Sequence, residues 1–259
     1  MTTSNSVTAP TAAATTDDEF QAELRSACLR DGPTTVRGIQ KAFQTYAKDV
    51  KNGASLDDFY RKVHTATGST GIAGLKTVHR ILGSIESLAR ELKDKPDRVS
   101  PSVMGTIAKS VDFLNALFEQ PIAVEHDRVP ALNVLALDDE EIALQAIEHS
   151  LRKEGLTPIC VKEPAKALEL ILDQQFDLVV LDIEMQGMNG LEFCSKLRNM
   201  PRYERIPIVF VTSRTSFENR AQAILSGGDD LIAKPFLFTE LALKALVLAV
   251  QSRLAAPRC

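Results

Sequence analysis

The sequence has no strong excess of charge of either sign and no long hydrophobic run. Lysine and arginine number 30 against 34 aspartates and glutamates, which leaves a formal net charge of −4 at pH 7. This balance provides no general basic surface, so we expect no nucleic-acid binding through bulk electrostatics and favour protein partners. No uninterrupted apolar run reaches the roughly 18 residues needed to cross a bilayer, so we also expect no membrane association.

Cysteine is scarce, and the N-terminus lacks any targeting pattern. The four cysteines lie far apart and form no CxxC pair: Cys28, Cys160, Cys194 and Cys259. This spacing is typical of a reduced, cytoplasmic protein. The first residues are mainly threonine, alanine and serine, without the basic start and apolar core of a signal peptide or an anchor. We predict a disordered tail over residues 1–16.

The first half of the chain has helical periodicity and no convincing strand. A chain of 259 residues with 44% hydrophobic residues can form two domains of ordinary size. Turn residues such as Asp31-Gly32-Pro33 and Asn52-Gly53 separate the periodic stretches. We therefore predict an antiparallel helical bundle over residues 17–120. Its five helices are expected at 17–30, 34–52, 55–73, 75–93 and 100–120.

After a predicted linker at 121–131, strand-like and helical stretches alternate strictly over residues 132–255. Alternation of this kind indicates parallel βαβ units, hence a doubly wound sheet with helices on both faces. The expected strands are 134–137, 158–161, 178–181, 206–211 and 231–233. The expected helices are 140–154, 164–174, 191–200, 217–226 and 239–254. The fold class is thus an all-α bundle followed by an α/β domain with a five-stranded parallel sheet.

Acidic residues follow two of the predicted strands directly. Asp182 ends an apolar strand, and Asp138 and Asp139 end the first one. If the first and third strands are neighbours, these three carboxylates meet at the carboxyl edge of the sheet, where open α/β sheets bind ligands. Like charges so close oppose one another's ionisation, and a hard cation such as Mg²⁺ would resolve the conflict. The alternative is that each acid caps the helix that follows it.

Two further strand ends carry groups suited to a phosphoryl site. The fourth strand ends in Thr212 and Ser213, and the fifth ends in Lys234 before Pro235. Lys234 could neutralise phosphate oxygens, and Thr212 could donate a hydrogen bond to one. A cis bond at Pro235 would aim Lys234 inward, although an X-Pro bond is trans by default.

With these pieces in place, residues 133–254 resemble the receiver domain of a response regulator, a flavodoxin-like fold. The matching segments are Asp138-Asp139, the run from Asp182 to Gly190, Thr212-Ser213, Gly227 to Asp230, and Lys234-Pro235-Phe236. The resemblance implies a definite role for each site residue. Asp182 would be the phosphoacceptor, Asp139, Asp182 and the backbone carbonyl of Glu184 the Mg²⁺ ligands, Asp138 an outer-shell acid, and Thr212 and Lys234 the residues that read phosphorylation.

The sequence departs from this family at two positions. Gln186 stands where the family usually has proline, which alters only the loop. Leu231, three residues before Lys234, replaces the aromatic that in many members swings inward when the phosphoryl group arrives. This replacement argues against a switch based on an aromatic rotamer. The run from Gly227 to Asp230 superficially resembles a diguanylate cyclase signature, but we interpret it as the loop before the last strand.

One histidine in the bundle has an unusual setting. Helical spacing puts His64 opposite the apolar side of its helix, so it is expected to face water. Gly68 and Gly71 follow on the same face, where each costs about 1 kcal/mol relative to alanine. Room for another protein to reach the imidazole would explain them.

The stretch around His64 resembles a histidine-phosphotransfer (HPt) domain. His64, Gly68, Ser69, Gly74 and the pair Ile85-Glu86 fit the family pattern, whereas Thr67 stands in the position of its lysine. The resemblance implies that His64 is a phosphohistidine site. The alternatives are a docking surface that is not phosphorylated and an incidental surface histidine.

The last predicted helix has more apolar surface than one sheet face requires. Residues 241–250 carry one charge in ten. This composition suggests a second contact, with the bundle or with a dimer mate, or simple deep burial.

Together these features predict a two-component signalling or phosphorelay protein. An upstream histidine kinase or phosphotransfer protein would phosphorylate Asp182, with a further transfer site at His64. The alternative is a phosphorylation-controlled interaction module with a chemically silent bundle. No ATP-binding, kinase or cyclase sequence is visible, so we expect no enzyme activity of that kind. The chain stops after the last helix, so we expect no DNA-binding output domain and a downstream partner that is a protein.

Overall fold

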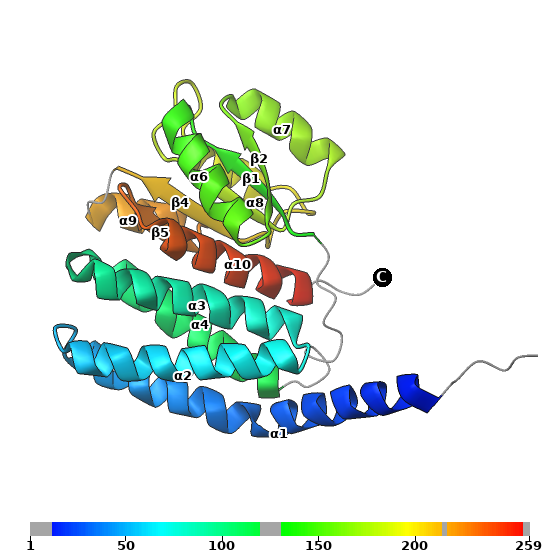
Figure 1. Ribbon diagram of the computed structural model, residues 1–259. Helices are drawn as coiled ribbons and strands as arrows, with labels where there is room; N and C mark the ends of the chain where they lie inside the picture. The colour runs from blue at the N-terminus through cyan, green and yellow to red at the C-terminus, as the bar shows by residue number, and fades with distance from the viewer. Residues whose placement is uncertain (1–11, 120–130, 214–216, 256–259) are drawn as a thin grey trace, which may run out of the picture.

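The computed structural model describes residues 12–119, 131–213 and 217–255. The first of these ranges forms the bundle of antiparallel helices that the sequence predicts (Figure 1). Its elements are α1 (Ala12–Lys48), α2 (Gly53–Ile72), α3 (Lys76–Asp94), the short 3-10 helix η1 (Pro96–Arg98) and α4 (Pro101–Glu119). The predicted linker lies almost wholly outside the described residues, as do His126 and Cys259.

The predicted break at Asp31-Gly32-Pro33 is wrong, because α1 runs through it as one helix. Gly32 faces Phe118 of α4 so closely that a β-carbon there would overlap the aromatic ring. The glycine is therefore explained by close helix packing, and Pro33 lies inside α1 without ending it. Figure 1 shows that α1 is bent, and a proline inside a helix is a usual cause of a bend. The helix also begins at Ala12, inside the predicted tail, because a run of alanines strongly favours helix. Residues 1–11 lie outside the described residues.

The second half is the doubly wound domain that the sequence predicts. Its strands form one parallel sheet with the order β2-β1-β3-β4-β5. The strands are β1 (Asn133–Leu137), β2 (Thr157–Val161), β3 (Leu178–Leu181), β4 (Ile208–Thr212) and β5 (Asp230–Ala233). The helices are α6 (Glu141–Lys153), α7 (Pro164–Asp173), α8 (Gly190–Arg198), α9 (Phe217–Leu225) and α10 (Phe238–Ala255). The fourth strand begins two residues later than predicted, after Pro207, which cannot donate a ladder hydrogen bond.

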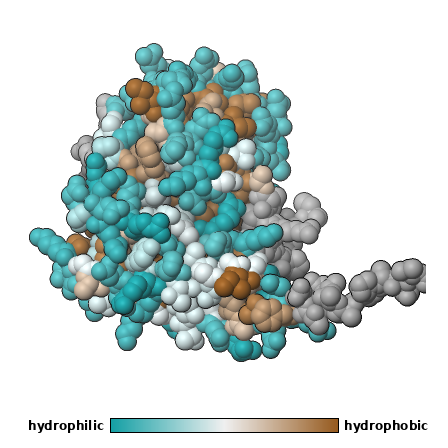
Figure 2. Space-filling view, in the orientation of Figure 1, coloured by the Kyte–Doolittle hydropathy of each residue, from teal (hydrophilic) through white to brown (hydrophobic). Residues whose placement is uncertain are grey.

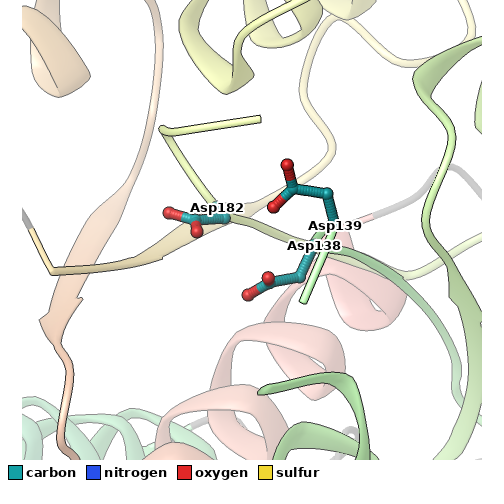
Figure 3. A group of neighbouring side chains, drawn as sticks. All are labelled: Asp138, Asp139 and Asp182. Atoms are coloured by element: carbon teal, nitrogen blue, oxygen red, sulfur yellow. The ribbon is translucent and has the colours of Figure 1, made fainter. Parts of the chain in front are cut away.

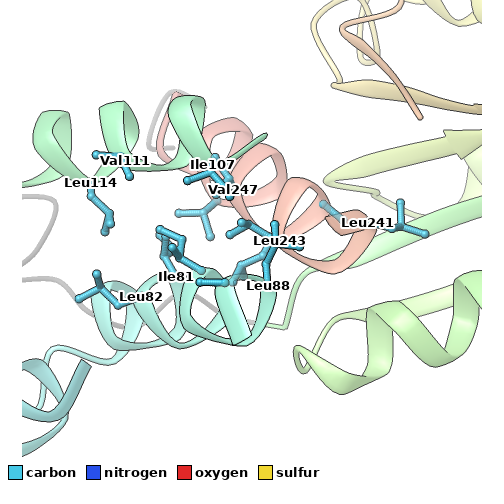
Figure 4. Close-up of a cluster of buried hydrophobic side chains, with 14 of the residues drawn as sticks. Ile81, Leu82, Leu88, Ile107, Val111, Leu114, Leu241, Leu243 and Val247 are labelled. Carbon is cyan, nitrogen blue, oxygen red and sulfur yellow. The ribbon is translucent and has the colours of Figure 1, made fainter. Parts of the chain in front are cut away.

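Alternate residues of each strand serve two different cores. In β3, Val179 and Leu181 pack with α7, α8 and α9, whereas Leu178 and Val180 face α6 and α10. The core on the α10 side continues without interruption into the helical bundle. Figure 4 shows the junction, where Leu243 and Val247 of α10 lie among Ile81 and Leu88 of α3 and side chains of α4. The excess apolar surface of α10 is therefore buried against the chain's own bundle.

Polar contacts join the same surfaces. At the start of α10, Thr239 Oγ1 donates to Glu91 Oε2 of α3 at 2.6 Å, and Ser102 Oγ of α4 donates to Glu240 Oε1 at 2.5 Å. Burial raises the pKa of Glu240, and the hydrogen bond from Ser102 offsets only part of this effect. We call these contacts, together with the apolar junction, the interdomain seam.

Asp230 forms the charged part of the seam. Lys244 of α10 and Lys109 of α4 each place Nζ 2.9 Å from one of its carboxylate oxygens. Burial alone would raise the pKa of Asp230, but the charge of Lys244 and hydrogen bonds from both lysines outweigh burial and hold the pKa below its ordinary value of 3.8. A carboxyl group with a lowered folded-state pKa stabilises the fold above its unfolded-state pKa, and this stabilisation is lost as pH falls through the folded-state value.

We expect Asp230→Asn to destabilise the protein by about 2 kcal/mol at neutral pH, because Lys244 would be left buried without its charge partner. Lys244 is only 5% exposed, whereas Lys109 is 64% exposed, so Lys109→Met should cost about 0.5 kcal/mol. Urea unfolding measures both. The gap between wild type and Asp230→Asn should close as pH falls from 3.8 through the lower folded-state pKa of Asp230. Equal effects of the two substitutions would contradict the buried pair.

Cys28, Cys160 and Cys194 are free thiols, and burial raises the pKa of Cys160 to about 11. The face shown in Figure 2 is mostly hydrophilic, with small separate hydrophobic patches. Among the described residues, none of the helices has the length and hydropathy that a membrane span requires.

Candidate functional site

The sheet register brings the predicted site residues to one edge. Leu137 of β1 pairs with Leu181 of β3, so Asp138 and Asp182 follow at equivalent positions. Thr212 of β4 pairs with Ala233 of β5, so Lys234 follows one residue beyond this pair. Because β1, β3, β4 and β5 follow one another in the sheet, the residues after these strands meet at one edge although they lie far apart in the chain.

Three carboxylates form the centre of this edge. Asp138, Asp139 and Asp182 can each offer an oxygen within 4.8 Å of the others. Figure 3 shows the three side chains extending from the ends of β1 and β3 toward a common region. Asp138 is fully buried and Asp182 is 4% exposed, while Asp139 is half-buried. This arrangement was predicted from the neighbouring strands, and it concentrates negative charge where water has little access.

Lys234 is the cation of the cluster. Its Nζ lies 2.6 Å from Asp138 Oδ2 and 2.9 Å from Asp182 Oδ2. Burial raises the pKa of Asp138, and the hydrogen bond from Lys234 reverses only part of this effect. Burial opposes the protonation of Lys234, but hydrogen bonds and charge from Asp138 and Asp182 outweigh it and raise the lysine pKa. The ammonium group is therefore held charged among the acids.

The Lys234–Pro235 peptide bond is cis, which is the alternative that the sequence left open. Lys234 is also tied to β4, because its backbone N–H donates to the carbonyl oxygen of Thr212 at 2.9 Å. Thr212 is completely buried at the end of β4. The residue that departs from the family pattern, Leu231, is buried in the core that β5 shares with α9. Lys234 and Thr212 thus share one rigid corner of the site.

The loop after β3 closes the other side of the cluster. Its backbone is held by the acids, since Glu184 N–H donates to Asp182 Oδ1 at 3.3 Å and Gln186 N–H donates to Asp139 Oδ2 at 3.1 Å. Ser213 Oγ donates to Glu184 Oε2 at 3.2 Å, which joins this loop to β4. The loop and Asp139, with Leu191 of α8 and Gln222 of α9, line an open hollow of about 500 Å³ beside the cluster. A small anionic group could therefore approach from solvent.

Gly190 sets the distance between α8 and the site. A β-carbon at this position would overlap the backbone carbonyl of Asp182, so only glycine allows the helix to start there. Asn189 caps α8 by accepting from the N–H of Glu192 at 2.9 Å. The Asn-Gly pair that indicated a turn in the sequence therefore also positions Asp182.

The structure places His64 far from this edge, on α2 of the bundle. Its side chain is 66% exposed, as predicted, and Nδ1 lies 3.1 Å from Oε1 of Glu86 on α3. Tyr60 stacks parallel to the imidazole with ring centroids 6.0 Å apart. Arg90 Nη2 donates to the same Glu86 oxygen at 2.8 Å. The sequence did not single out Tyr60 or Arg90. Tyr60 lies four residues before His64 on the same helix, a spacing that could have indicated the contact, whereas only the pairing of α2 with α3 brings Arg90 there.

The two glycines near His64 have different explanations. A β-carbon on Gly68 would meet open space, which agrees with room for a partner. A β-carbon on Gly71 would lie 3.0 Å from the His79 ring, so Gly71 accommodates the packing of His79. The expectation that both glycines make room beneath His64 is therefore wrong for Gly71.

Comparison with known proteins gives the second half of the chain a family. Residues 134–246 match the family model described as response regulator receiver domain. The curated protein named "Uncharacterized transcriptional regulatory protein YrkP" from Bacillus subtilis (strain 168) is 37% identical over 111 residues, which cover 43% of this chain and 46% of that relative. The chain thus spans about half the length of the curated relative that it matches.

Two solved structures are similar to the same region. The chemotaxis response regulator CheY4 of Vibrio cholerae is 28% identical over 43% of this chain and 93% of its own, with a TM-score of 0.42. The Francisella response regulator 1452 receiver domain is 27% identical over 46% of this chain and 98% of its own, with a TM-score of 0.44. The family match identifies the C-terminal half as a receiver domain, which is a two-component signalling module.

Proposed function

With residues 134–246 as a receiver domain, we propose that Asp182 is its phosphoacceptor and that an external phosphohistidine supplies the phosphoryl group. The observation that carries this proposal is the buried Asp182 carboxylate in contact with Lys234 and beside two further acids. An upstream histidine kinase or phosphotransfer protein would be the donor. Incubation with such a donor tests the proposal, and Asp182→Asn should then take up no acyl phosphate.

The residues at this edge fit a magnesium ion. Mg²⁺ prefers oxygen ligands, usually one or two carboxylates together with waters and phosphate oxygens. Asp139, Asp182 and the backbone carbonyl of Glu184 would hold it, with Asp138 outside the ligand set. A bound Mg²⁺ supplies positive charge that stabilises the oxygens of a transferring phosphoryl group. The close acids, which repel one another, make a divalent cation favourable here.

The protein's own side chains account for the transfer. A carboxylate oxygen of Asp182 attacks phosphorus, a new O–P bond forms, and the P–N bond to the donor imidazole breaks. The bonding electron pair stays on the imidazole nitrogen. Lys234 offsets the charge on the phosphoryl oxygens, and Thr212 then donates a hydrogen bond to one of them. Lys234 and Thr212 would thus contact the resulting acyl phosphate and change position when it forms.

We further propose that His64 of the bundle is a phosphotransfer site. The buried carboxylate of Glu86 accepts a hydrogen bond from Nδ1–H of His64, so in the neutral ring the proton resides on Nδ1. The lone pair of Nε2 is then available to solvent on an exposed ring. The helical architecture supports the resemblance to an HPt domain. In this role the protein would be a phosphorelay intermediate and not a kinase.

Because α3 lies between the helix of His64 and the receiver, we expect His64 to transfer phosphate between molecules and not within one chain. His64 lies on α2, which packs on α3, and α3 in turn packs on α10 of the receiver (Figure 1). The buried seam holds the two halves together in this order. His64 would therefore exchange phosphate with the receiver of another molecule.

A second candidate function is supported by the interdomain seam. Lys234, which contacts Asp182, precedes Thr239 and Glu240 by only five and six residues, and these two bind the bundle through Glu91 and Ser102. Phosphorylation that draws Lys234 and Thr212 toward the phosphoryl group would strain this short connection. The receiver would then control which partner the bundle binds, whether or not His64 is phosphorylated.

Hydrogen exchange tests this coupling directly. After phosphorylation of Asp182, we expect the amides of α3 and α4 that lie against α10 to exchange about tenfold faster, because local opening becomes easier. Asp182→Asn treated with the same donor is the control and should not change. Unaltered exchange in a fully phosphorylated wild type would rule out control through the seam.

A further inference from the structure

The surroundings of His64 are organised as two facing pairs of side chains. His64 of α2 lies opposite Glu86 of α3, and one turn away Tyr60 lies opposite Arg90. The Tyr60 and His64 rings are within 9° of parallel. Arg90 Nη2 donates to both Tyr60 Oη at 3.0 Å and Glu86 Oε1 at 2.8 Å. Arg90 thus bridges the stacked tyrosine and the carboxylate that holds the imidazole.

Thr67, which stands where HPt domains have a lysine, does not supply a cation. Its hydroxyl donates to the backbone carbonyl of Val63 at 2.9 Å, so this side chain is engaged within α2. A phosphoryl group on His64 would add up to two negative charges at neutral pH. It would lie near Glu86, whose side chain is only 10% exposed. A positive charge from another element would offset this repulsion.

Other basic side chains nearby are paired with acids of their own. Lys93 Nζ lies 4.8 Å from the Tyr60 ring centroid but binds Asp57 at 2.7 Å. Lys62, one helical turn from Asp58, binds that residue at 2.7 Å. Arg90 differs from them, because the acid it binds is the one that contacts His64.

We propose that Arg90 is the positioning residue that supplies, from α3, the positive charge that Thr67 cannot supply from α2. It neutralises Glu86 and holds Tyr60 along the imidazole, so that Glu86 orients His64 without repelling the phosphoryl group. This inference rests on the proposed phosphotransfer role of His64. The inference also includes Tyr60 among the residues that position His64, since the Tyr60 hydroxyl lies 3.3 Å from Glu86 Oε1.

The test uses the full chain carrying Asp182→Asn, with phosphoramidate as the phosphoryl donor. Phosphorylation of His64 is followed by intact mass and by acid-labile, base-stable label. Adding Arg90→Gln should lower the yield and shorten the lifetime of the phosphohistidine about fivefold, the effect of losing one partly exposed charge contact. Arg61→Gln is the matched control, because Arg61 is an exposed arginine of α2 that pairs with Asp58. It should leave both quantities unchanged.

Rescue separates charge supply from a structural effect. Thr67→Lys placed in the Arg90→Gln chain should restore the phosphohistidine lifetime, because it returns a cation from the other helix. Equal behaviour of Arg90→Gln and Arg61→Gln, or no rescue by Thr67→Lys, would overturn the inference. Failure of the parent chain to gain label above a His64→Gln chain would instead remove the phosphotransfer role itself, and the inference with it.

Discussion

Asp182→Asn is expected to abolish acyl-phosphate formation, lowering uptake from a phosphohistidine donor by on the order of 10³-fold or more, because the attacking oxygen is removed. The amide has the same shape as the carboxylate and keeps one acceptor oxygen, which can take the place of Oδ2 toward Lys234 or of Oδ1 toward the backbone N–H of Glu184. The fold should therefore survive, and loss of label would report chemistry. Base-labile label measured with Mg²⁺ present gives the answer.

Asp177→Asn is a matched control for this experiment. Asp177 is also a buried carboxylate, 7% exposed, but it precedes β3 at the amino edge of the sheet and binds Arg253 at 2.7 Å. Its substitution should lower stability and leave phosphorylation intact. If Asp182→Asn still accepted an acyl phosphate while Asp177→Asn lost it, the assignment of the phosphoacceptor would be wrong.

The acidic edge could be predicted because it depends on the residue that directly follows each strand in the sequence. Each strand of the sheet is a short apolar run, and the residue that ends each run reaches the same edge once the strands are parallel. Knowing that β1 and β3 are neighbours is then enough to bring Asp138 and Asp182 together. Lys234 and Thr212 follow from the same reasoning at β5 and β4.

The features that could not be predicted depend on contacts between elements far apart in the chain. Gly32 and Pro33 indicate a turn by composition, yet the ring of Phe118 requires a glycine inside a continuous helix. Gly71 is likewise explained only by the packing of His79. Local propensity is a weak prior that tertiary packing overrides.

The composition of α10 predicted only part of its environment. Its apolar residues indicated a second contact but not the surface against which the helix packs. Residues on nearly every side of α10 are buried, and the choice of the bundle as partner depends on matching polar groups such as Glu91 and Ser102. No periodicity within either half encodes that match.

His64→Gln is expected to remove all acid-labile, base-stable label from the chain, a loss on the order of 10³-fold or more, because glutamine has no nucleophilic nitrogen. Wild type should carry this label after incubation with a phosphohistidine donor, because Asp182 can pass the phosphoryl group on, and Asp182→Asn should carry it after incubation with phosphoramidate. His79→Gln is the matched control, since His79 is another exposed bundle histidine, with Nδ1 2.9 Å from the carbonyl of Thr67. Label that persists in His64→Gln but disappears in His79→Gln would mean that His79, and not His64, is the phosphorylated histidine.

Mixing Asp182→Asn with His64→Gln then tests whether the phosphoryl group passes between His64 and Asp182 of different molecules. Phosphorylated Asp182→Asn carries label only on His64, and unlabelled His64→Gln offers only Asp182. We expect label to pass from the first to the second as base-labile acyl phosphate, because α3 and the buried seam separate His64 from Asp182 within one molecule. Transfer in wild type should accordingly rise with protein concentration. A rate that does not depend on concentration would mean that the seam opens and that transfer occurs within one chain.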